Sequence, residues 1–456
     1  MAENRDESST GKKEGWSRRD FFKLAGTTAA AGALLSMPSW VTAGKPSTQS
    51  PETLNWEQVQ DAFILDEDRI YMNIGTTGSM PEHVLEEYDR LNWAVARDPW
   101  GMEGEFGDKW PYSMAMRETL APQFGADTEE FVITGNTTMG MNIILNGLEF
   151  KKDDVILTTN QEHIAATSPM ALLRDRIGVQ IVEIPVPTGI TASEKEIMAR
   201  FEKYLDYYRP KLLVFSHITY TTGLRLPAKK ICKRANIYRV PTLVDGAHAS
   251  GMLDLDFRDM GCTFYAASGH KWQCGPGGTG LLYVRNADDN DPTLWPILSS
   301  LYEYWESFGM GTALQYHGNP NYPAMQALVE SCSFWEKIGR KNIEKRVLDL
   351  SAYCKDMLGS TFDWPPLYCP NDPSVSSGLT TFNPFKNTGS EDLVNKFREK
   401  LHRDYGYVIR YTHFKESENA TDDTYALRIS THLFNDYDQI DGLMDAMRKV
   451  YNDMRH

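Results

Sequence analysis

The sequence predicts an α/β fold, with a mostly parallel, seven-stranded sheet between helices and a smaller α+β domain after it. Between residues of about 130 and 290, short apolar runs rich in β-branched residues alternate with helical or polar stretches, which is the pattern of a parallel sheet covered by helices. From about residue 325 the pattern changes to a long helical stretch, 324–358, followed by two or three strands and terminal helices. A chain of 456 residues with 41% hydrophobic content is long enough for two such domains.

Seven apolar runs are the predicted strands of the sheet, and several of them end in a small or polar residue. Ligands bind at the carboxyl ends of strands in open α/β sheets, so the residues that follow these runs are candidates for a site. In chain order the runs are "EFVITG", "DVILTT", "VQIVEIPV", "KLLVFSHI", "PTLVDGA", "FYAAS" and "GLLYVR". We expect a large domain over 71–322, a small α+β domain over 323–456, and a segment 44–70 that packs with the small domain.

The first 43 residues are typical of an export signal and not of a folded domain. The stretch Ser17-Arg18-Arg19 is followed by Phe-Phe-Lys, then by a weakly apolar run and a Val-Thr-Ala ending at Ala43. This order indicates a secretory signal, and the paired arginines before Phe-Phe-Lys indicate the twin-arginine type. The apolar run is too short to span a bilayer. We expect use of the twin-arginine export machinery, cleavage near Ala43, a periplasmic mature protein and no stable membrane anchor.

Charge and cysteine spacing exclude several classes of function. The net charge of −15 and the isoelectric point near 5.2 disfavour a nucleic-acid partner, which would need concentrated Lys and Arg. The six cysteines have no spacing suited to a metal, and no disulfide pairing is predicted. A small molecule is the expected partner.

Hydroxyl, imidazole and carboxylate groups follow the predicted strands in order. Thr137 and Thr138 come after the first run, where a helix begins, and can bind an anion there, although ordinary helix capping explains them equally well. His163 follows the second run, and its ring can cover an aromatic ligand, although a lone histidine is more often structural. Asp245 ends the "TLVD" run and is costly to bury without a cation or a donor; alternatively, it caps a helix.

Lys271 lies in "AASGHKW", after the "FYAAS" run and before the glycine-rich "GPGGTG". Its neighbours Ser268 and His270 carry groups that suit a phosphate. A buried lysine amine has a lowered pKa and attacks carbonyl carbons. Alone, the heptapeptide fits a solvated lysine at a strand end as well as a lysine that holds a covalent cofactor.

Taken together, these motifs resemble the class V aminotransferase family of fold type I enzymes, which depend on pyridoxal 5'-phosphate. The resemblance covers about residues 65–445 and rests on the Asn-Thr-Thr motif, "SHITYTTG", "VDGAHA", "SGHKW" with "GPGGTG", and "LRISTHLFND". The local sequence is most similar to the isopenicillin N epimerase branch. The resemblance implies pyridoxal 5'-phosphate as the cofactor, an amino substrate, and a homodimer with active sites at its interface.

The resemblance also implies a role for each matching residue. Lys271 matches the Schiff-base lysine, Asp245 the partner of the pyridine nitrogen, and His163 the stacking ring; these are the expected catalytic residues. His248 matches the position that bonds the phenolic oxygen of the cofactor, with Tyr220 or Thr219 at the same edge. The expected phosphate ligands are Thr138, Ser268 and His270, with Thr137 a weaker candidate.

For the substrate, the resemblance implies that Arg428 binds an α-carboxylate and that Asn73 and Gly75 line the mouth of the site. Either Thr312 or Asn319 is expected to reach the phosphate in the partner subunit. The freed Lys271 amine is the natural base for the α-proton, while Asp245 keeps the cofactor ring protonated.

The reaction itself is less defined by the sequence. We expect aminotransferase-type chemistry on an amino acid or on an amine-bearing secondary metabolite, such as a siderophore-like peptide. An epimerase or racemase is the main alternative. A cysteine desulfurase is disfavoured because the stretch 405–430 before and around Arg428 contains no cysteine. A protein that binds the cofactor without catalysis is the remaining alternative.

Overall fold

The structure is a computed structural model, and it describes residues 55–99, 113–286, 293–304, 309–362, 367–416 and 420–455. The expected signal peptide, residues 1–43, lies outside the described residues. Val59–His456 form one compact unit, and the description below concerns this unit. None of the described helices combines the length and the apolarity that a membrane crossing requires.

The central sheet has seven strands in the order β2-β8-β7-β6-β5-β3-β4. All seven predicted strands are confirmed, with ends that differ by at most two residues. Strands β7, β6, β5, β3 and β4 are mutually parallel, and only β8 runs antiparallel to both of its neighbours. The strands are β2 (Phe131–Thr134), β3 (Val155–Thr159), β4 (Gln180–Ile184), β5 (Leu212–Ser216), β6 (Thr242–Asp245), β7 (Phe264–Ser268) and β8 (Gly280–Val284).

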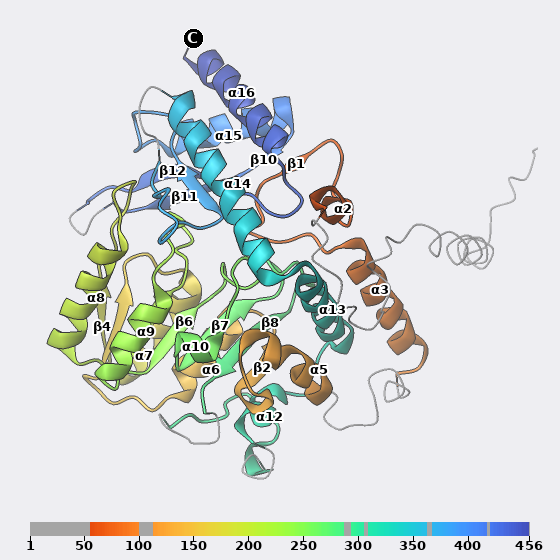
Figure 1. The fold of residues 1–456 in the computed structure, drawn as a ribbon. Helices are drawn as coiled ribbons and strands as arrows, with labels where there is room; N and C mark the ends of the chain where they lie inside the picture. Colours follow the sequence, from red (N-terminus) through yellow and green to blue (C-terminus); the bar gives the residue numbers. More distant parts are fainter. Residues whose placement is uncertain are drawn as a thin grey trace, which may run out of the picture. The chain divides into compact units, whose positions relative to one another are not determined.

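Helices cover both faces of this sheet, as right-handed crossovers between parallel strands require. Connections that lead from β2 towards β4 contain α6 (Thr137–Gly147) and α7 (Ile164–Ile177). Connections that return from β4 towards β7 contain α8 (Glu194–Tyr208), α9 (Ala228–Ile237) and α10 (Phe257–Met260), and α8 and α9 lie on the near side of the sheet in Figure 1. One core fills the space between the sheet and α6 and α7, with Val132, Ile144, Leu173, Val214 and Leu282 among its buried members.

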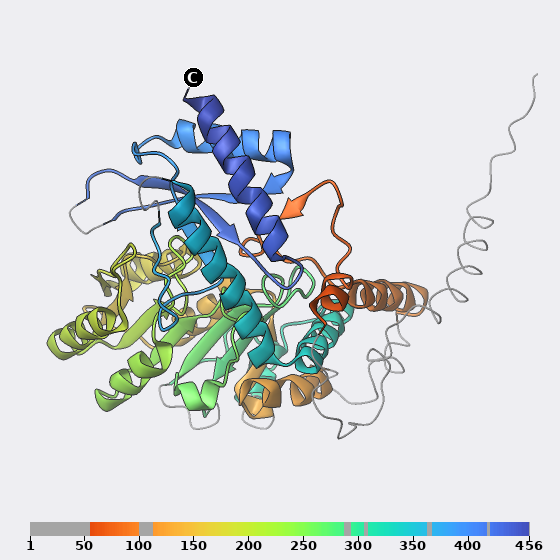
Figure 2. The same cartoon turned by 45° about the horizontal axis from the view of Figure 1, so that its top comes forward.

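The C-terminal region has its own sheet and its own core. Strands β11 (Arg410–Phe414), β12 (Thr424–Ser430) and β9 (Leu379–Phe382) form an antiparallel sheet in that order. Helices α14 (Arg340–Thr361), α15 (Glu391–Tyr405) and α16 (Tyr437–Met454) pack with it. The short strand β1 (Ile70–Tyr71) pairs with β10 (Tyr407–Val408), and Figure 2 shows β1, in orange, beside the blue C-terminal elements.

The long helical pattern over 324–358 is two helices and not one. The first, α13 (Tyr322–Ile338), ends at Gly339, and α14 begins at the next residue. Gly339 has a φ of 89°, a left-handed conformation that ends a helix and that glycine adopts at little cost. Helix α14 then runs from α13 towards the C-terminal elements (Figure 1).

The remaining described elements are short or lie beside these two sheets. They are α2 (Trp56–Gln60), α3 (Glu82–Arg97), α5 (Ser113–Leu120), η1 (Ala121–Phe124), η2 (Thr128–Glu130), η3 (Tyr302–Tyr304) and α12 (Met310–Gln315).

Candidate active site

The carboxyl ends of the central strands open into a cavity of about 270 Å³. Eleven of the fourteen predicted site residues line it, although they come from segments up to 353 residues apart. These eleven are Gly75, Thr137, Thr138, His163, Tyr220, Asp245, His248, Ser268, His270, Lys271 and Arg428. Five further residues complete the lining: Thr76, Asn136, Ala165, Ala247 and Arg410.

Lys271 is held in a tight loop at the end of β7. The backbone N–H of Gly78 donates to the carbonyl of His270 at 2.7 Å, and a Cβ on Gly78 would lie 2.2 Å from the carbonyl oxygen of Lys271. Only glycine therefore allows the N-terminal segment to pack this closely. Burial lowers the pKa of Lys271 to about 8, against the opposing effect of Asp245 and with help from Arg428. The amine is thus a far better nucleophile at neutral pH than an exposed lysine.

Asp245 ends β6 with a buried carboxylate, 4% exposed. Its Oδ1 accepts from the backbone N–H of Ala247 at 2.9 Å, and a turn follows it, so the alternative of a helix cap is wrong. Burial raises the pKa of Asp245, while the Ala247 N–H and Lys271 lower it. A buried carboxylate with one hydrogen bond is stabilised by a cation at its side. A protonated pyridine nitrogen is such a cation.

An anion site lies where α6 begins. Asn136 caps this helix, since its side chain accepts from the backbone N–H of Met139 at 2.9 Å. Thr137 and Thr138 therefore occupy the first helical positions and do not cap the helix. The Thr137 hydroxyl is 2.6 Å from that of Ser268, and His270 lies beside them in the lining. Hydroxyls and free N–H groups at a helix N-terminus fit a phosphate.

His163 is neutral and its ring is fixed in the cavity. It caps α7, because its Nδ1 accepts from the backbone N–H of Ala165 at 3.1 Å. Burial, together with the nearby Lys271, lowers the pKa of His163 to about 4. Its ring meets Tyr220 edge-on, with 5.0 Å between centroids. A neutral ring of fixed orientation suits the stacking role expected for it.

His248 is held as a single tautomer by Trp272. The Trp272 indole N–H donates to Nδ1 of His248 at 3.2 Å, so the ring proton is on Nε2. Burial, with Lys271 next in effect, lowers the pKa of His248 well below its usual value. The remaining Nε2–H is a donor, which is what a bond to a phenolic oxygen requires. Trp272, which is fully buried, therefore sets this proton position.

Two arginines face the cavity from neighbouring strands. Arg410 on β11 lies opposite Arg428 on β12 in the strand register, and both donate to the Thr76 hydroxyl, at 2.9 and 3.5 Å. Arg428 also donates to the carbonyl of Tyr220 at 2.6 Å, and its buried Nε has no partner among the described residues. Burial and the charge of Arg410 lower the pKa of Arg428 to about 9. A ligand carboxylate beside Arg428 would accept from the unpaired Nε–H and would offset the repulsion between the two guanidinium charges.

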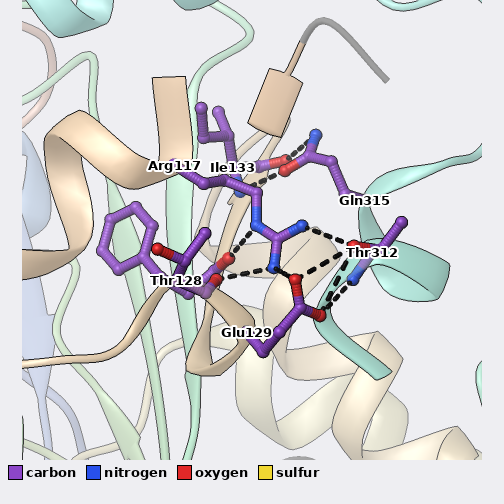
Figure 3. Close-up of polar contacts among 7 residues, drawn as sticks. Arg117, Thr128, Glu129, Ile133, Thr312 and Gln315 are labelled. Atoms are coloured by element: carbon purple, nitrogen blue, oxygen red, sulfur yellow. Dashed lines mark hydrogen bonds and ion pairs between the residues drawn. The ribbon is translucent and has the colours of Figure 1, made fainter. Parts of the chain in front are cut away.

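Three predicted residues do not reach this cavity. Asn73 accepts from the Thr76 hydroxyl at 2.8 Å and so positions a lining residue. Thr312 is buried, and its hydroxyl is 3.0 Å from Arg117 and 3.1 Å from Glu129 (Figure 3). Asn319 is exposed. The Thr312 hydroxyl is thus engaged within its own chain, and the contact of Thr312 or Asn319 with a partner's phosphate stays a prediction.

Thr219, the alternative to Tyr220, also lies outside the lining. It is fully buried and its hydroxyl is 2.7 Å from that of Thr222. Of the five lining residues outside the predicted set, Thr76 and Arg410 contribute side chains that bind Asn73 or each other at the mouth of the cavity. Thr76 directly follows the predicted Gly75 and could have been included, whereas nothing local to Arg410 distinguishes it from a solvated strand arginine.

Comparisons with known proteins agree with this arrangement. The model of the family described as Aminotransferase class-V matches residues 59–443. The chain is 27% identical over 419 residues to isopenicillin N epimerase of Streptomyces clavuligerus. This alignment covers 86% of the present chain and 98% of the epimerase. It is 27% identical over 333 residues to a probable cysteine desulfurase of Xylella fastidiosa, covering 68% and 77% of the two chains.

A solved structure shows the same fold. It is a variant of C-DES with glycine covalently linked to its PLP cofactor, with a TM-score of 0.70 and 22% identity. The match covers 85% of this chain and 98% of that chain. The α/β fold with a mostly parallel seven-stranded sheet, expected from the sequence, is therefore confirmed.

Proposed function

Because the chain belongs to the class V aminotransferase family, whose cofactor is pyridoxal 5'-phosphate, we propose that it carries out aminotransferase-type chemistry on the primary amine of an amino acid or of an amine-bearing secondary metabolite. One observation supports this most directly: Lys271, with its pKa lowered to about 8, shares a cavity with Asp245, Arg428 and the anion site at α6. Each of these groups suits a different part of the cofactor or of an amino acid.

The described residues fit the cofactor. Asp245 would accept the pyridine N–H, His163 would cover one face of the ring, and His248 would donate to its phenolic oxygen. Thr137, Thr138, Ser268 and His270 would hold the phosphate. When bound, the cofactor supplies a carbonyl that captures amines and a ring that withdraws electrons from the bonds at the α-carbon.

The chain itself then performs three tasks. Arg428 and Arg410 orient the substrate through its carboxylate. Lys271 takes the α-proton and returns a proton, since its lowered pKa lets it act in both directions near neutral pH. Asp245 stays ionised beside a cation and so keeps the electron-withdrawing form of the ring.

The test is spectroscopic. Purified protein loaded with cofactor should absorb in the near-visible band of a lysine-bound pyridoxal, and Lys271→Ala should lose that band. A panel of amino donors should shift the band in the wild type, and mass spectrometry should detect the keto acid released from the productive donor. A wild type that stays colourless after reconstitution would refute the proposal, and a stable colour with no response to any amine would favour binding without catalysis.

Epimerisation is the second candidate, and two observations favour it. The epimerase relative is aligned over 98% of its length. Tyr220, whose pKa is raised by burial, offers a second proton donor in the cavity besides Lys271, and inversion at a carbon needs proton transfer on both faces. Deuterium incorporation at the α-carbon without release of a keto acid would identify epimerisation.

The desulfurase relatives call for a separate comment. The usual route needs a reactive cysteine near the substrate, yet the six cysteines are all buried and none lines the cavity. Burial also raises the pKa of the Cys274 thiol, three residues after Lys271. A buried thiol with a raised pKa is a poor nucleophile, which disfavours this activity.

We further propose that the protein is exported folded to the periplasm with its cofactor in place and modifies a metabolite, such as a siderophore-like peptide, that matures there. The support is the order of residues 17–43, with Arg18-Arg19 before an apolar run. A conservative pair of changes, R18K with R19K, should leave the active protein in the cytoplasm. Normal fractionation of this double variant to the periplasm would contradict the proposal.

A further inference from the structure

A second cavity, of about 400 Å³, adjoins the first. Its lining comes from the loop after β3, from β4 and the residues after it, from the loop after β5, and from β11 with the turn that follows it. The residues that matter here are Gln161, Glu183, Tyr220, Thr221, Lys415 and Asp423. None of the roles discussed so far uses this space.

Tyr220 is the wall between the two cavities, since it lines both. Burial raises the pKa of its phenol, and the charges around it come from both sides: Arg410 and Arg428 in the first cavity, Asp423 and Glu162 in the second. The adjacent residues Glu162 and His163 lie on opposite sides of this wall: Glu162 lines the second cavity and His163 lines the first. A substrate held by Arg428 can therefore extend past one side chain into the second cavity.

Gln161 brings an unused hydrogen-bonding group to this cavity. It is 3% exposed, and its Oε1 accepts from the Thr221 hydroxyl at 2.5 Å. Its Nε2 has no hydrogen-bond partner among the described residues. A buried amide N–H without an acceptor is costly, and a ligand carbonyl would satisfy it.

The charges of the cavity are mainly negative. Glu183 and Asp423 supply the carboxylates, whereas Lys415 is the one lysine or arginine in its lining. Glu162 also lines the cavity, but burial raises its pKa to about 7, so it adds only part of a charge near neutral pH. His413 also lines it and its Nδ1 lies 3.2 Å from Asp423. A second carboxylate on the substrate would be repelled here, whereas a carboxamide could accept from Gln161 and donate its own N–H groups to a carboxylate.

The size of the first cavity favours use of the second. At about 270 Å³ the first cavity is slightly smaller than typical ligand sites, which span roughly 300–1,000 Å³. The cofactor and the α-carbon of the substrate would take most of it. A longer side chain would therefore have most of its free space in the adjoining cavity.

We propose that the second cavity binds the distal end of the substrate's side chain and selects a carboxamide over a carboxylate, with Gln161 as the specificity-determining residue. The inference rests on the proposed function, because it takes the amine to react at Lys271. It assigns the substrate class as α-amino acids with a side chain of glutamine-like length that ends in an amide.

The test is a titration of the cofactor-loaded enzyme with three amines, in which the shift of the near-visible band reports the dissociation constant of each amine. Racemic alanine, glutamine and glutamate are used so that stereochemical preference does not enter. The wild type should bind glutamine more tightly than glutamate. Gln161→Leu removes the amide at similar volume. It should weaken the binding of glutamine about tenfold and change the affinity for alanine less than twofold. Gln180→Leu, the same change on an exposed residue of β4, is the matched control.

A second variant tests the charge argument independently of Gln161. Asp423→Asn should increase the affinity for glutamate and so reduce the difference in affinity between glutamine and glutamate. The inference is overturned if Gln161→Leu weakens alanine binding as much as glutamine binding, or if it leaves glutamine binding unchanged. It is also overturned if the wild type binds glutamate more tightly than glutamine. A band that responds to no amine at all would instead overturn the proposed function, and this inference with it.

Discussion

The nucleophilicity of Lys271 should show a pH dependence set by its surroundings. Its pKa is lowered from 10.5 to about 8, first by burial and then, against the pull of Asp245, by Arg428 and Arg410. At pH 7.5 about one amine in four is then neutral, whereas about one in a thousand would be neutral with the ordinary value. Cofactor capture by the apoprotein should therefore be faster by roughly two orders of magnitude than for an exposed lysine.

The assay is stopped-flow absorbance of apoprotein mixed with pyridoxal 5'-phosphate from pH 6 to 10. Because only the neutral amine attacks, the rate should rise with pH and level off above a midpoint of about 8. Two variants should move this midpoint in opposite directions. Asp245→Asn removes a charge that favours the ammonium and should lower the midpoint, whereas Arg428→Gln removes a charge that disfavours it and should raise the midpoint.

The control is Arg174→Gln, which removes an exposed arginine of α7 outside the cavity lining and should not shift the midpoint. A wild-type midpoint near 10 would refute the reasoning, since it would mean that burial does not tune Lys271. Shifts of the same sign in the Asp245 and Arg428 variants would show that something other than local charge controls the amine.

Three further outcomes are expected. Trp272→Phe should lower the free energy of unfolding by about 1–3 kcal/mol in urea titrations and weaken cofactor binding, because His248 loses the donor that fixes its tautomer; unchanged cofactor affinity would argue against that role. Arg428→Lys should weaken the binding of alanine about 10- to 100-fold in band-shift titrations, but should leave the binding of alaninamide, which lacks a carboxylate, nearly unaffected. Equal losses of affinity for both amines would contradict carboxylate binding. Arg117→Met should reduce stability by about 2–4 kcal/mol, because Arg117 is fully buried and donates to two backbone carbonyls as well as to Glu129; a loss below about 0.5 kcal/mol would show that the network (Figure 3) matters little to folding.

The Arg117 network shows why the sequence could not choose between Thr312 and Asn319. Thr312 of helix α12 bonds Arg117 and Glu129. Gln315 attaches the same helix to β2, because its amide bonds both the N–H and the carbonyl of Ile133, at 2.7 and 3.0 Å. A threonine near a glycine in the sequence carries no sign of such partners, because Arg117 is 195 residues away. The contact expected of Thr312 therefore could not be judged before its surroundings were known.

The catalytic motifs were predictable for a physical reason. Parallel strands place their carboxyl ends at one edge of a sheet, so residues that follow successive strands must meet there. Asp245 after β6 and Lys271 after β7 are read directly from apolar runs in the chain. The same logic reaches Thr137 after β2 and His163 after β3.

By itself, then, the sequence determined the strands, their polar ends and the lysine at the centre, because these depend on local hydrophobic pattern and on the geometry of a parallel sheet. Only the tertiary structure decided which residues from distant segments complete the site. Arg410 faces the cavity because β11 pairs with β12 in one register, and a shift of one residue would turn its side chain to the other face. The proton of His248 and the free amide of Gln161 likewise depend on partners that only three-dimensional packing brings within hydrogen-bonding distance.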